Sequence, residues 1–125
     1  FQQIMTNIIE NSAKYSVKYL KTKIKTFYKD EKVFIEVSNT AIPISTKDCD
    51  KIFTKFARID NPLTRKVQGS GLGLYITKNL TEKMNGEISV KSENIEPDLD
   101  EITFAISFPI LTIEEQARIK CNQYL

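Results

Sequence analysis

The feature that most constrains this chain of 125 residues is the run Gly69-Ser70-Gly71-Leu72-Gly73-Leu74, which leads directly into the apolar stretch Leu74-Tyr75-Ile76. Glycine has no Cβ, so alternate glycines let the backbone adopt positive φ and let its N–H groups approach an anion closely. A helix that follows at once adds unpaired N–H groups and the positive end of its dipole. The run therefore predicts a phosphate-binding loop at a helix start, with an ordinary glycine loop as the alternative.

The spacing of these glycines differs from both familiar nucleotide-binding patterns. It reads G-x-G-x-G instead of G-x-G-x-x-G, and no Gly-Lys-Ser/Thr follows. Neither a dinucleotide-binding fingerprint nor a Walker loop is indicated. The function of the loop therefore has to be inferred from the rest of the chain.

Composition indicates one soluble globular domain. Charged residues make up 27% and apolar residues 41%, and no apolar stretch approaches the roughly 20 residues of a membrane span. The net charge is only +2 and the lysines are scattered, so nucleic acid is not an expected partner. The local cluster of Lys18, Lys21, Lys23 and Lys25 is typical of a solvated sheet edge.

The residue types that are missing or isolated exclude several chemistries. The chain has no histidine, which removes imidazole bases and any phosphohistidine from this segment. Cys49 and Cys121 lie far apart, so neither a disulfide framework nor a zinc site is indicated, and a reducing compartment fits best. The chain begins at Phe1 inside a helical pattern, from which we expect it to be a fragment of a longer protein.

The hydrophobic pattern predicts helices and hairpins in alternation. Helical spacing is found in residues 1–18, 48–56 and 72–84, whereas alternation of period two is found in residues 23–28, 33–38, 87–92 and 102–108. Residues 29–32 read as a polar turn, residues 58–71 as a surface loop, and residues 93–101 as an exposed hairpin loop. We expect an α+β two-layer sandwich, with helices on one face of a mixed, mostly antiparallel sheet. Residues 111–125 are expected to form a terminal helix or a tail.

Four segments carry a resemblance to a known family: Asn7-Ile8-Ile9-Glu10-Asn11-Ser12-Ala13-Lys14-Tyr15-Ser16, residues 52–60, residues 69–74 and residues 85–92. The first three are similar to the asparagine box, the phenylalanine box and the second glycine box of sensor histidine kinases. The chain thus resembles the ATP-binding catalytic domain of these kinases, a branch of the GHKL superfamily with the Bergerat fold. The resemblance covers residues 1–110, as an N-terminally truncated domain.

On the first helix the resemblance implies a site for ATP and Mg²⁺. Asn11 is expected to coordinate Mg²⁺ through its side-chain oxygen, and Asn7 to support the metal or a bound water. Lys14 is expected to contact phosphate and Tyr15 to pack near the nucleoside. Glu10 is a candidate for polarising the attacking nucleophile. A solvated helix face, and a plain core role for Tyr15, are the alternatives.

In the loop and the glycine run the resemblance implies contacts to the phosphates. Arg58 and Lys55 are expected to reach the γ-phosphate from a lid, with Arg65 assisting as the lid closes. Phe53 and Phe56 are expected to anchor the base of the lid in the core. The remaining nucleotide-binding residues implied by the second glycine box are Gly69, Ser70, Gly71, Leu72 and Gly73.

The chain departs from the family where Asp-x-Gly-x-Gly is usual. It has Asn39-Thr40-Ala41-Ile42-Pro43, followed by Ile44, which we also place in the nucleotide pocket. Asn39 can still accept a hydrogen bond from the adenine amino group, but without the charge-assisted part, of order 1 kcal/mol or more. Its NH₂ can also turn toward a guanine carbonyl, so we expect weaker affinity and weaker base discrimination.

The leading hypothesis is the catalytic domain of a two-component sensor histidine kinase, which transfers the γ-phosphoryl group of ATP to a histidine outside this chain. The expected partners are the dimerisation and phosphoacceptor domain and a response regulator. We expect a cytoplasmic, monomeric fragment, and a membrane anchor in the parent is left open. A degenerate, non-catalytic signalling module is the alternative that residues 39–43 favour. A topoisomerase, mismatch-repair or chaperone ATPase is disfavoured, because those relatives place an acidic residue at the position of Asn7.

Overall fold

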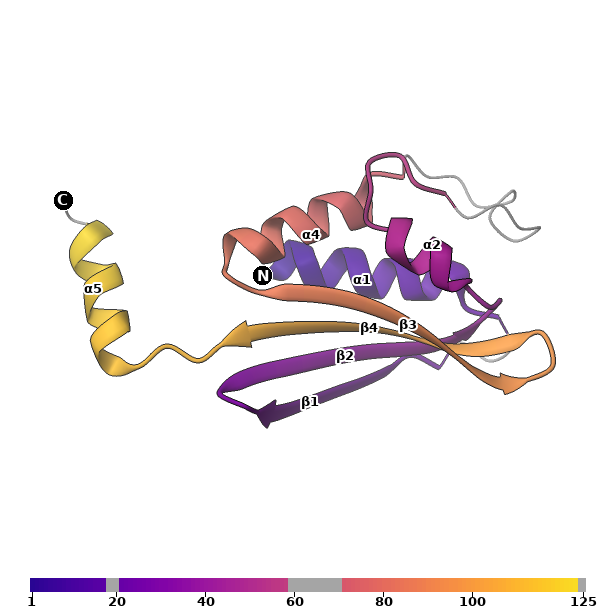
Figure 1. The fold of residues 1–125 in the computed structure, drawn as a ribbon, viewed down its shortest axis with the longest axis horizontal. Coiled ribbons are helices and arrows are strands. Elements are labelled where there is room, and N and C mark those ends of the chain that lie inside the picture. The colour runs from indigo at the N-terminus through magenta and orange to yellow at the C-terminus, as the bar shows by residue number, and fades with distance from the viewer. Residues whose placement is uncertain (18–20, 59–70, 124–125) are drawn as a thin grey trace.

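The computed structural model describes residues 1–17, 21–58 and 71–123. Helices α1, α2 and α4 lie on one face of a four-stranded sheet with strand order β1-β2-β4-β3 (Figure 1). All three strand pairings within the described residues are antiparallel. The α+β two-layer sandwich is therefore confirmed. The elements are α1 (Gln2–Tyr15), β1 (Lys23–Lys29), β2 (Lys32–Ala41), α2 (Thr46–Lys51), α4 (Gly73–Lys83), β3 (Glu87–Glu96), β4 (Leu99–Pro109) and α5 (Ile113–Gln123).

The first hairpin turns where the sequence predicted it. Asp30 and Glu31 connect β1 to β2, and both have positive φ, at 51° and 59°. Two left-handed residues in succession give a turn whose twist matches that of the flanking strands. The register that results pairs Ile24 with Val37 and Phe27 with Phe34.

The second hairpin is longer than predicted, so the expected exposed loop over residues 93–101 is wrong. Strand β3 continues to Glu96, and β4 begins at Leu99. The side-chain amide of Asn94 donates hydrogen bonds to the carbonyl oxygens of Glu96 and Leu99, at 2.9 and 3.3 Å. These polar bonds extend the pairing beyond the apolar alternation on which the prediction depended.

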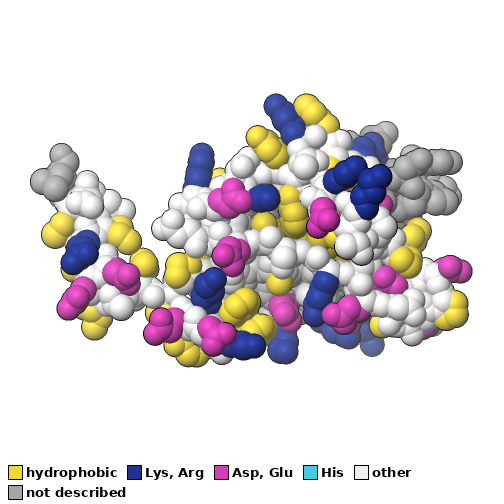
Figure 2. Space-filling view, in the orientation of Figure 1, with side chains coloured by type: hydrophobic (Ala, Val, Ile, Leu, Met, Phe, Trp, Pro, Cys, Tyr) yellow, Lys and Arg dark blue, Asp and Glu magenta, His cyan; other side chains and the backbone are white. Residues whose placement is uncertain are grey.

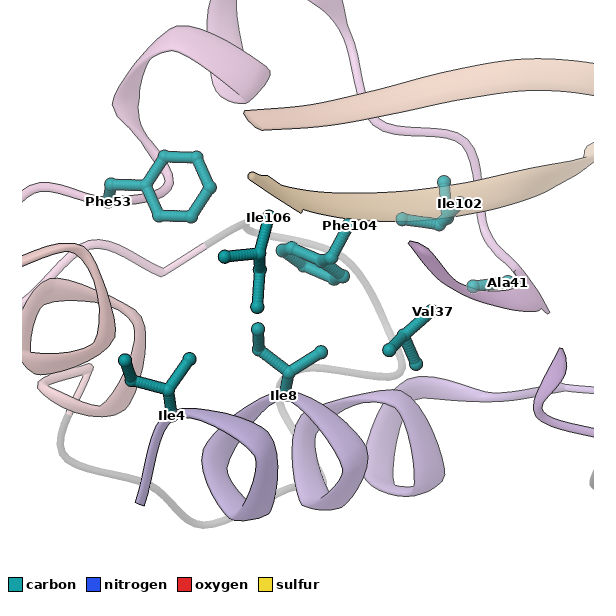
Figure 3. Packing of buried hydrophobic residues seen from close by; sticks show 8 residues of the cluster. All are labelled: Ile4, Ile8, Val37, Ala41, Phe53, Ile102, Phe104 and Ile106. Carbon is teal, nitrogen blue, oxygen red and sulfur yellow. The ribbon is translucent and has the colours of Figure 1, made fainter. Parts of the chain in front are cut away.

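The core lies between α1 and the two central strands. Ile4 and Ile8 on α1 point toward side chains of β2 and β4 (Figure 3). Phe53 closes one side of this layer, with its ring centroid 6.3 Å from that of Phe104 in an edge-to-face arrangement. This packing fixes α1 on the sheet and thereby positions its polar residues. The buried apolar residues are Ile4, Ile8, Val37, Ala41, Phe53, Ile102, Phe104 and Ile106.

The edge strand β1 is largely exposed, and its lysines are solvated, as predicted for the lysine cluster. Lys21, Lys23 and Lys25 are exposed, and Lys23 pairs with Glu101 at 3.0 Å; Lys18 lies outside the described residues. Figure 2 shows positive and negative side chains interspersed across the visible face. In that view no large area of one sign gathers on the described residues.

Helix α5 stands clear of the sandwich, and its residues are exposed (Figure 1). Its start is closed by a reciprocal pair of hydrogen bonds. The N–H of Thr112 donates to Glu115 Oε2 at 2.7 Å, and the N–H of Glu115 donates to Thr112 Oγ1 at 3.2 Å. Residues 113–123 are therefore a helix, one of the two predicted alternatives. Within the described ranges, no helix is both long and apolar enough to cross a membrane.

Candidate functional site

Helix α1 is tied to the first turn of α4 through one side chain. Asn7 Nδ2 donates to Thr77 Oγ1 at 3.1 Å and to the carbonyl oxygen of Gly73 at 3.4 Å. Thr77, which is fully buried, donates its own hydroxyl to the same Gly73 carbonyl at 2.8 Å. The asparagine segment is thus joined to the helix that follows the glycine run. Sequence analysis missed Thr77, although a threonine on the inner face of an amphipathic helix was a detectable signal.

The other predicted residues of α1 follow Asn7 along the helix. Asn11 is half-buried one turn later, and its side chain makes no hydrogen bond with any described residue. Lys14 is exposed and Tyr15 is half-buried. Magnesium prefers oxygen ligands and needs few from the protein when phosphates supply the rest. The uncommitted amide of Asn11 fits that requirement, and no cluster of three His, Cys, Asp or Glu side chains competes for a metal among the described residues.

Glu10 lies on the same helix, directly before Asn11 and about one turn after Asn7. It is exposed, and it lines a shallow hollow of about 450 Å³ on α1 together with Phe1, Gln2, Met5, Thr6 and Ile9. Among the hydrogen bonds of the described residues, none joins Glu10 to Asn7 or Asn11. The role of Glu10 in polarising the nucleophile therefore stays a prediction.

Two buried polar residues lie in the layer between α1 and β2. Asn39 is 4% exposed, and its side chain makes no hydrogen bond within the described chain. Alternation along β2 places it on the same face as Val37, toward α1. Ser12 is 1% exposed on the inner face of α1, and its hydroxyl also has no partner. Ser12 was not predicted as a site residue; its polar side chain at a core position was the available signal.

The segment after β2 is held by side chains of the second hairpin. The N–H of Ile44 donates to Ser92 Oγ at 3.0 Å, and the Ser92 hydroxyl donates to the carboxylate of Asp100. Asn94 Nδ2 donates to the other oxygen of that carboxylate at 3.2 Å. Asp100 is 7% exposed. A buried, hydrogen-bonded carboxylate therefore positions the backbone of Ile44.

The two described ends of the predicted lid segment meet at Gly71. The N–H of Phe56 donates to the Gly71 carbonyl at 3.1 Å, and Gly71 has φ +71°. Phe56 itself is 63% exposed, so the expectation that it anchors the core is wrong, whereas the same expectation for Phe53 is confirmed. The ring of Phe56 instead lies under Lys55, whose Nζ is 5.4 Å from the ring centroid.

Of the remaining predicted site residues, some lie in the described part of the chain and others lie outside it. Arg58 is exposed, Leu72 is half-buried, and a Cβ built at Gly73 would meet no heavy atom within 4 Å. Arg65, Gly69 and Ser70 lie outside the described residues. The space around Gly73 shows that packing within the described chain does not require a glycine there.

The two-layer fold and the pairing of an asparagine-bearing helix with a glycine-opened helix define an ATP-binding domain of the GHKL type. Residues 1–111 match the family described as histidine kinase-, DNA gyrase B- and HSP90-like ATPase. The chain belongs to this family.

The individual relatives to which the chain is similar include histidine kinases. It is 39% identical over 93 residues to the signal transduction histidine-protein kinase ArlS of Staphylococcus aureus strain USA300. That match covers 74% of this chain and 21% of ArlS, so the chain spans about a fifth of the length of the curated relatives it matches.

Solved structures of similar fold are histidine kinases as well. The catalytic domain of histidine kinase ThkA has a TM-score of 0.67 and 29% identity, covering 86% of this chain and 64% of that chain. The mycobacterial sensor histidine kinase MprB has a TM-score of 0.73, covering 86% of this chain and 68% of that chain. Its identity of 21% supports likeness of fold alone.

Proposed function

We propose that residues 1–110 are the catalytic domain of a two-component sensor kinase, which transfers the γ-phosphoryl group of ATP to a histidine elsewhere in the parent protein. The observation that carries the proposal is the bond from Asn7 to the first turn of α4, 3.1 Å to Thr77 Oγ1. This bond holds the asparagine side chains of α1, whose oxygens can bind a metal, beside the start of α4. The free N–H groups at a helix start favour anions. Residues 111–125 are proposed to be an appended element.

The phosphate end of the site is proposed to use α1 and the start of α4. Asn11 holds Mg²⁺ through its amide oxygen, with Asn7 supporting it. The bound ion supplies positive charge between the phosphate oxygens. Lys14, on the same helix, adds a point charge for phosphate. The backbone N–H groups of the glycine run orient the triphosphate for in-line transfer.

The base end of the site is proposed to lie between α1 and β2. Asn39 accepts a hydrogen bond from the adenine amino group through its side-chain oxygen, while Tyr15 and Ile44 bound the nucleoside. Ser12 Oγ, the buried polar atom without a hydrogen-bond partner among the described residues, gains one when a base or an ordered water is bound beside Asn39. Since Asn39 is neutral, adenine is held less tightly than by a carboxylate.

The γ-phosphate is proposed to be neutralised by cations around the segment that returns at Gly71, namely Lys55, Arg58 and Arg65. Glu10 remains the candidate for polarising the incoming nucleophile. Because the chain has no histidine, the attacking nitrogen belongs to the dimerisation and phosphoacceptor domain. A response regulator is the downstream partner, and the domain is placed in the cytoplasm.

Calorimetric titration with ADP and with a non-hydrolysable ATP analogue tests this proposal, with and without Mg²⁺ and with GTP as competitor. Magnesium-dependent, adenine-selective binding in the micromolar range supports a working catalytic domain. Absence of binding at millimolar nucleotide, from a sample shown to be folded, would leave the degenerate signalling module that residues 39–43 favour. Phosphorylation in trans of the parent's phosphoacceptor domain then tests the transfer step itself.

A further inference from the structure

We propose that Thr77 is a positioning residue that sets the orientation of the Asn7 side-chain amide, so that the amide oxygen of Asn7 is turned away from α4 and toward the metal and phosphate site. The inference rests on the proposed function. It adds a residue of α4 to a site whose metal-binding side chains lie on α1.

The orientation follows from counting hydrogens. A threonine hydroxyl has one hydrogen, and Thr77 gives it to the carbonyl oxygen of Gly73 at 2.8 Å. Toward Asn7, 3.1 Å away, Thr77 Oγ1 can then only accept. The second neighbour of the same Asn7 atom is the Gly73 carbonyl at 3.4 Å, which also only accepts. Both neighbours therefore require the NH₂ group of Asn7 on this side.

The consequence lies on the opposite side of the same amide. With the nitrogen committed to α4, Asn7 Oδ1 is the atom left for other partners. A cation or a water bound to it is attracted by this oxygen and repelled by an N–H group. If the acceptor at position 77 is lost, only the longer 3.4 Å bond to the Gly73 carbonyl favours this orientation, so the amide spends more time rotated by 180°, an orientation that does not support the metal.

Thr81 provides a matched control one turn further along α4. Thr77 and Thr81 are both fully buried, and each hydroxyl donates to the carbonyl oxygen four residues earlier. The bond from Thr81 to Thr77 measures 2.7 Å. Of these two threonines, only Thr77 has a side-chain hydrogen bond to α1 among the described residues. A change of threonine to valine thus removes the same kind of hydrogen bond within α4 at both positions. Only the change at position 77 also removes the bond to Asn7.

The experiment compares Thr77→Val, Thr77→Ser and Thr81→Val by calorimetric titration with ADP, with and without Mg²⁺. We expect Thr77→Val to weaken binding in the presence of Mg²⁺ by about 5- to 10-fold, the scale of one lost hydrogen bond. Binding without Mg²⁺ should stay within about twofold. Thr77→Ser should restore wild-type affinity, and Thr81→Val should change neither titration.

A second measurement needs neither metal nor nucleotide. The side-chain NH₂ resonances of Asn7 in a ¹⁵N spectrum should shift and exchange faster in Thr77→Val and stay unchanged in Thr81→Val. Adding Thr77→Val to Asn7→Ala should cause no further loss of Mg²⁺-dependent affinity, because the effect acts through Asn7. This cycle remains informative even if Thr77→Val lowers stability.

Three results would overturn the inference: equal losses with and without Mg²⁺, equal losses in Thr77→Val and Thr81→Val, or unchanged Asn7 resonances in Thr77→Val. A wild-type chain that binds no nucleotide would instead contradict the proposed function. In that case the Asn7 resonances alone still test whether Thr77 orients the amide.

Discussion

The backbone N–H of Phe56 donates a 3.1 Å hydrogen bond to the carbonyl oxygen of Gly71, so the segments that flank residues 59–70 meet at one point. A Cβ added to Gly71 would lie 2.9 Å from the Cα and carbonyl carbon of Phe56. These are backbone atoms, which cannot move aside as the end of a side chain can. The contact therefore depends on glycine both for space and for its φ of +71°.

Replacement of Gly71 by alanine is expected to lower the free energy of unfolding by about 1–3 kcal/mol, from left-handed strain and the backbone clash together. Urea denaturation followed by circular dichroism measures this. An unchanged denaturation midpoint would show that residues 56 and 71 do not meet in solution.

Replacement of Gly73 by alanine is expected to weaken nucleotide binding without lowering the free energy of unfolding. Its Cβ meets no heavy atom within 4 Å, so the free energy of unfolding should be kept or raised by up to about 1 kcal/mol. If phosphate approaches the backbone here, the added methyl group should weaken nucleotide affinity by about tenfold or more. Wild-type affinity in a stable Gly73→Ala variant would argue against a phosphate contact at this residue.

Ser12→Ala is expected to stabilise the nucleotide-free chain. A buried hydroxyl without a partner carries a desolvation penalty of about 1–3 kcal/mol, and alanine removes that hydroxyl from the core. We expect a gain of about 1 kcal/mol, seen as a rise of roughly 4 °C in the melting temperature. Ser89→Ala, at an exposed serine of β3, is the control and should leave the melting temperature unchanged. A fall in melting temperature for Ser12→Ala would mean that the hydroxyl has a partner in solution.

Asn39→Asp is expected to improve selection of adenine over guanine. A carboxylate can accept from the adenine amino group but cannot donate to a guanine carbonyl. The charge-assisted bond should strengthen ATP binding by about 5- to 10-fold relative to GTP, on the scale of about 1 kcal/mol or more. Competition titrations of the two nucleotides measure the ratio. A ratio that does not change would place the base away from Asn39.

The helix content of α5 is expected to depend on pH through Glu115. Hydrogen bonds from Thr112 lower the pKa of this carboxyl below its ordinary value of 4.5. Since the folded pKa is the lower one, the contribution to helix stability is present above pH 4.5 and is lost as the pH falls through the depressed value. Chemical shifts of α5, followed from pH 6 down to pH 2 or so, report this loss. Glu115→Gln, which cannot titrate, should abolish the dependence, and a dependence that persists in that variant would assign it to another group.

Most of the fold could be predicted, because its elements follow apolar periodicity. Helix α1 and the β1–β2 hairpin have clear periods of 3.6 and 2 residues, and the structure confirms both. Where polar side chains decide the structure, the pattern was insufficient. Asn94 extends the second hairpin through hydrogen bonds that no periodicity reveals.

The candidate site was predicted along α1 and missed where it depends on contacts distant in sequence. Thr77 bonds to Asn7 across 70 residues, and nothing local to Thr77 identifies its partner. In the sequence, Ser12 is one polar residue on the apolar face of a helix. What singles it out is that its hydroxyl is buried without a hydrogen-bond partner among the described residues. Phe56 was misassigned because a phenylalanine is expected inside, whereas its φ of +62° turns the side chain outward.

The chain from Asp100 through Ser92 to the backbone of Ile44 has a consequence for how this domain tolerates change. Ile44, which we propose to bound the nucleoside, is held by side chains of a hairpin remote in sequence, so its position does not depend on glycines in the segment before it. Ala41 and Pro43 are then compatible with the proposed base site. Substitutions at Asp100 and Ser92, in contrast, are expected to disturb it. Drug resistance or drift in nucleotide preference would accordingly be sought at the tip of the second hairpin as much as at the residues that contact the base.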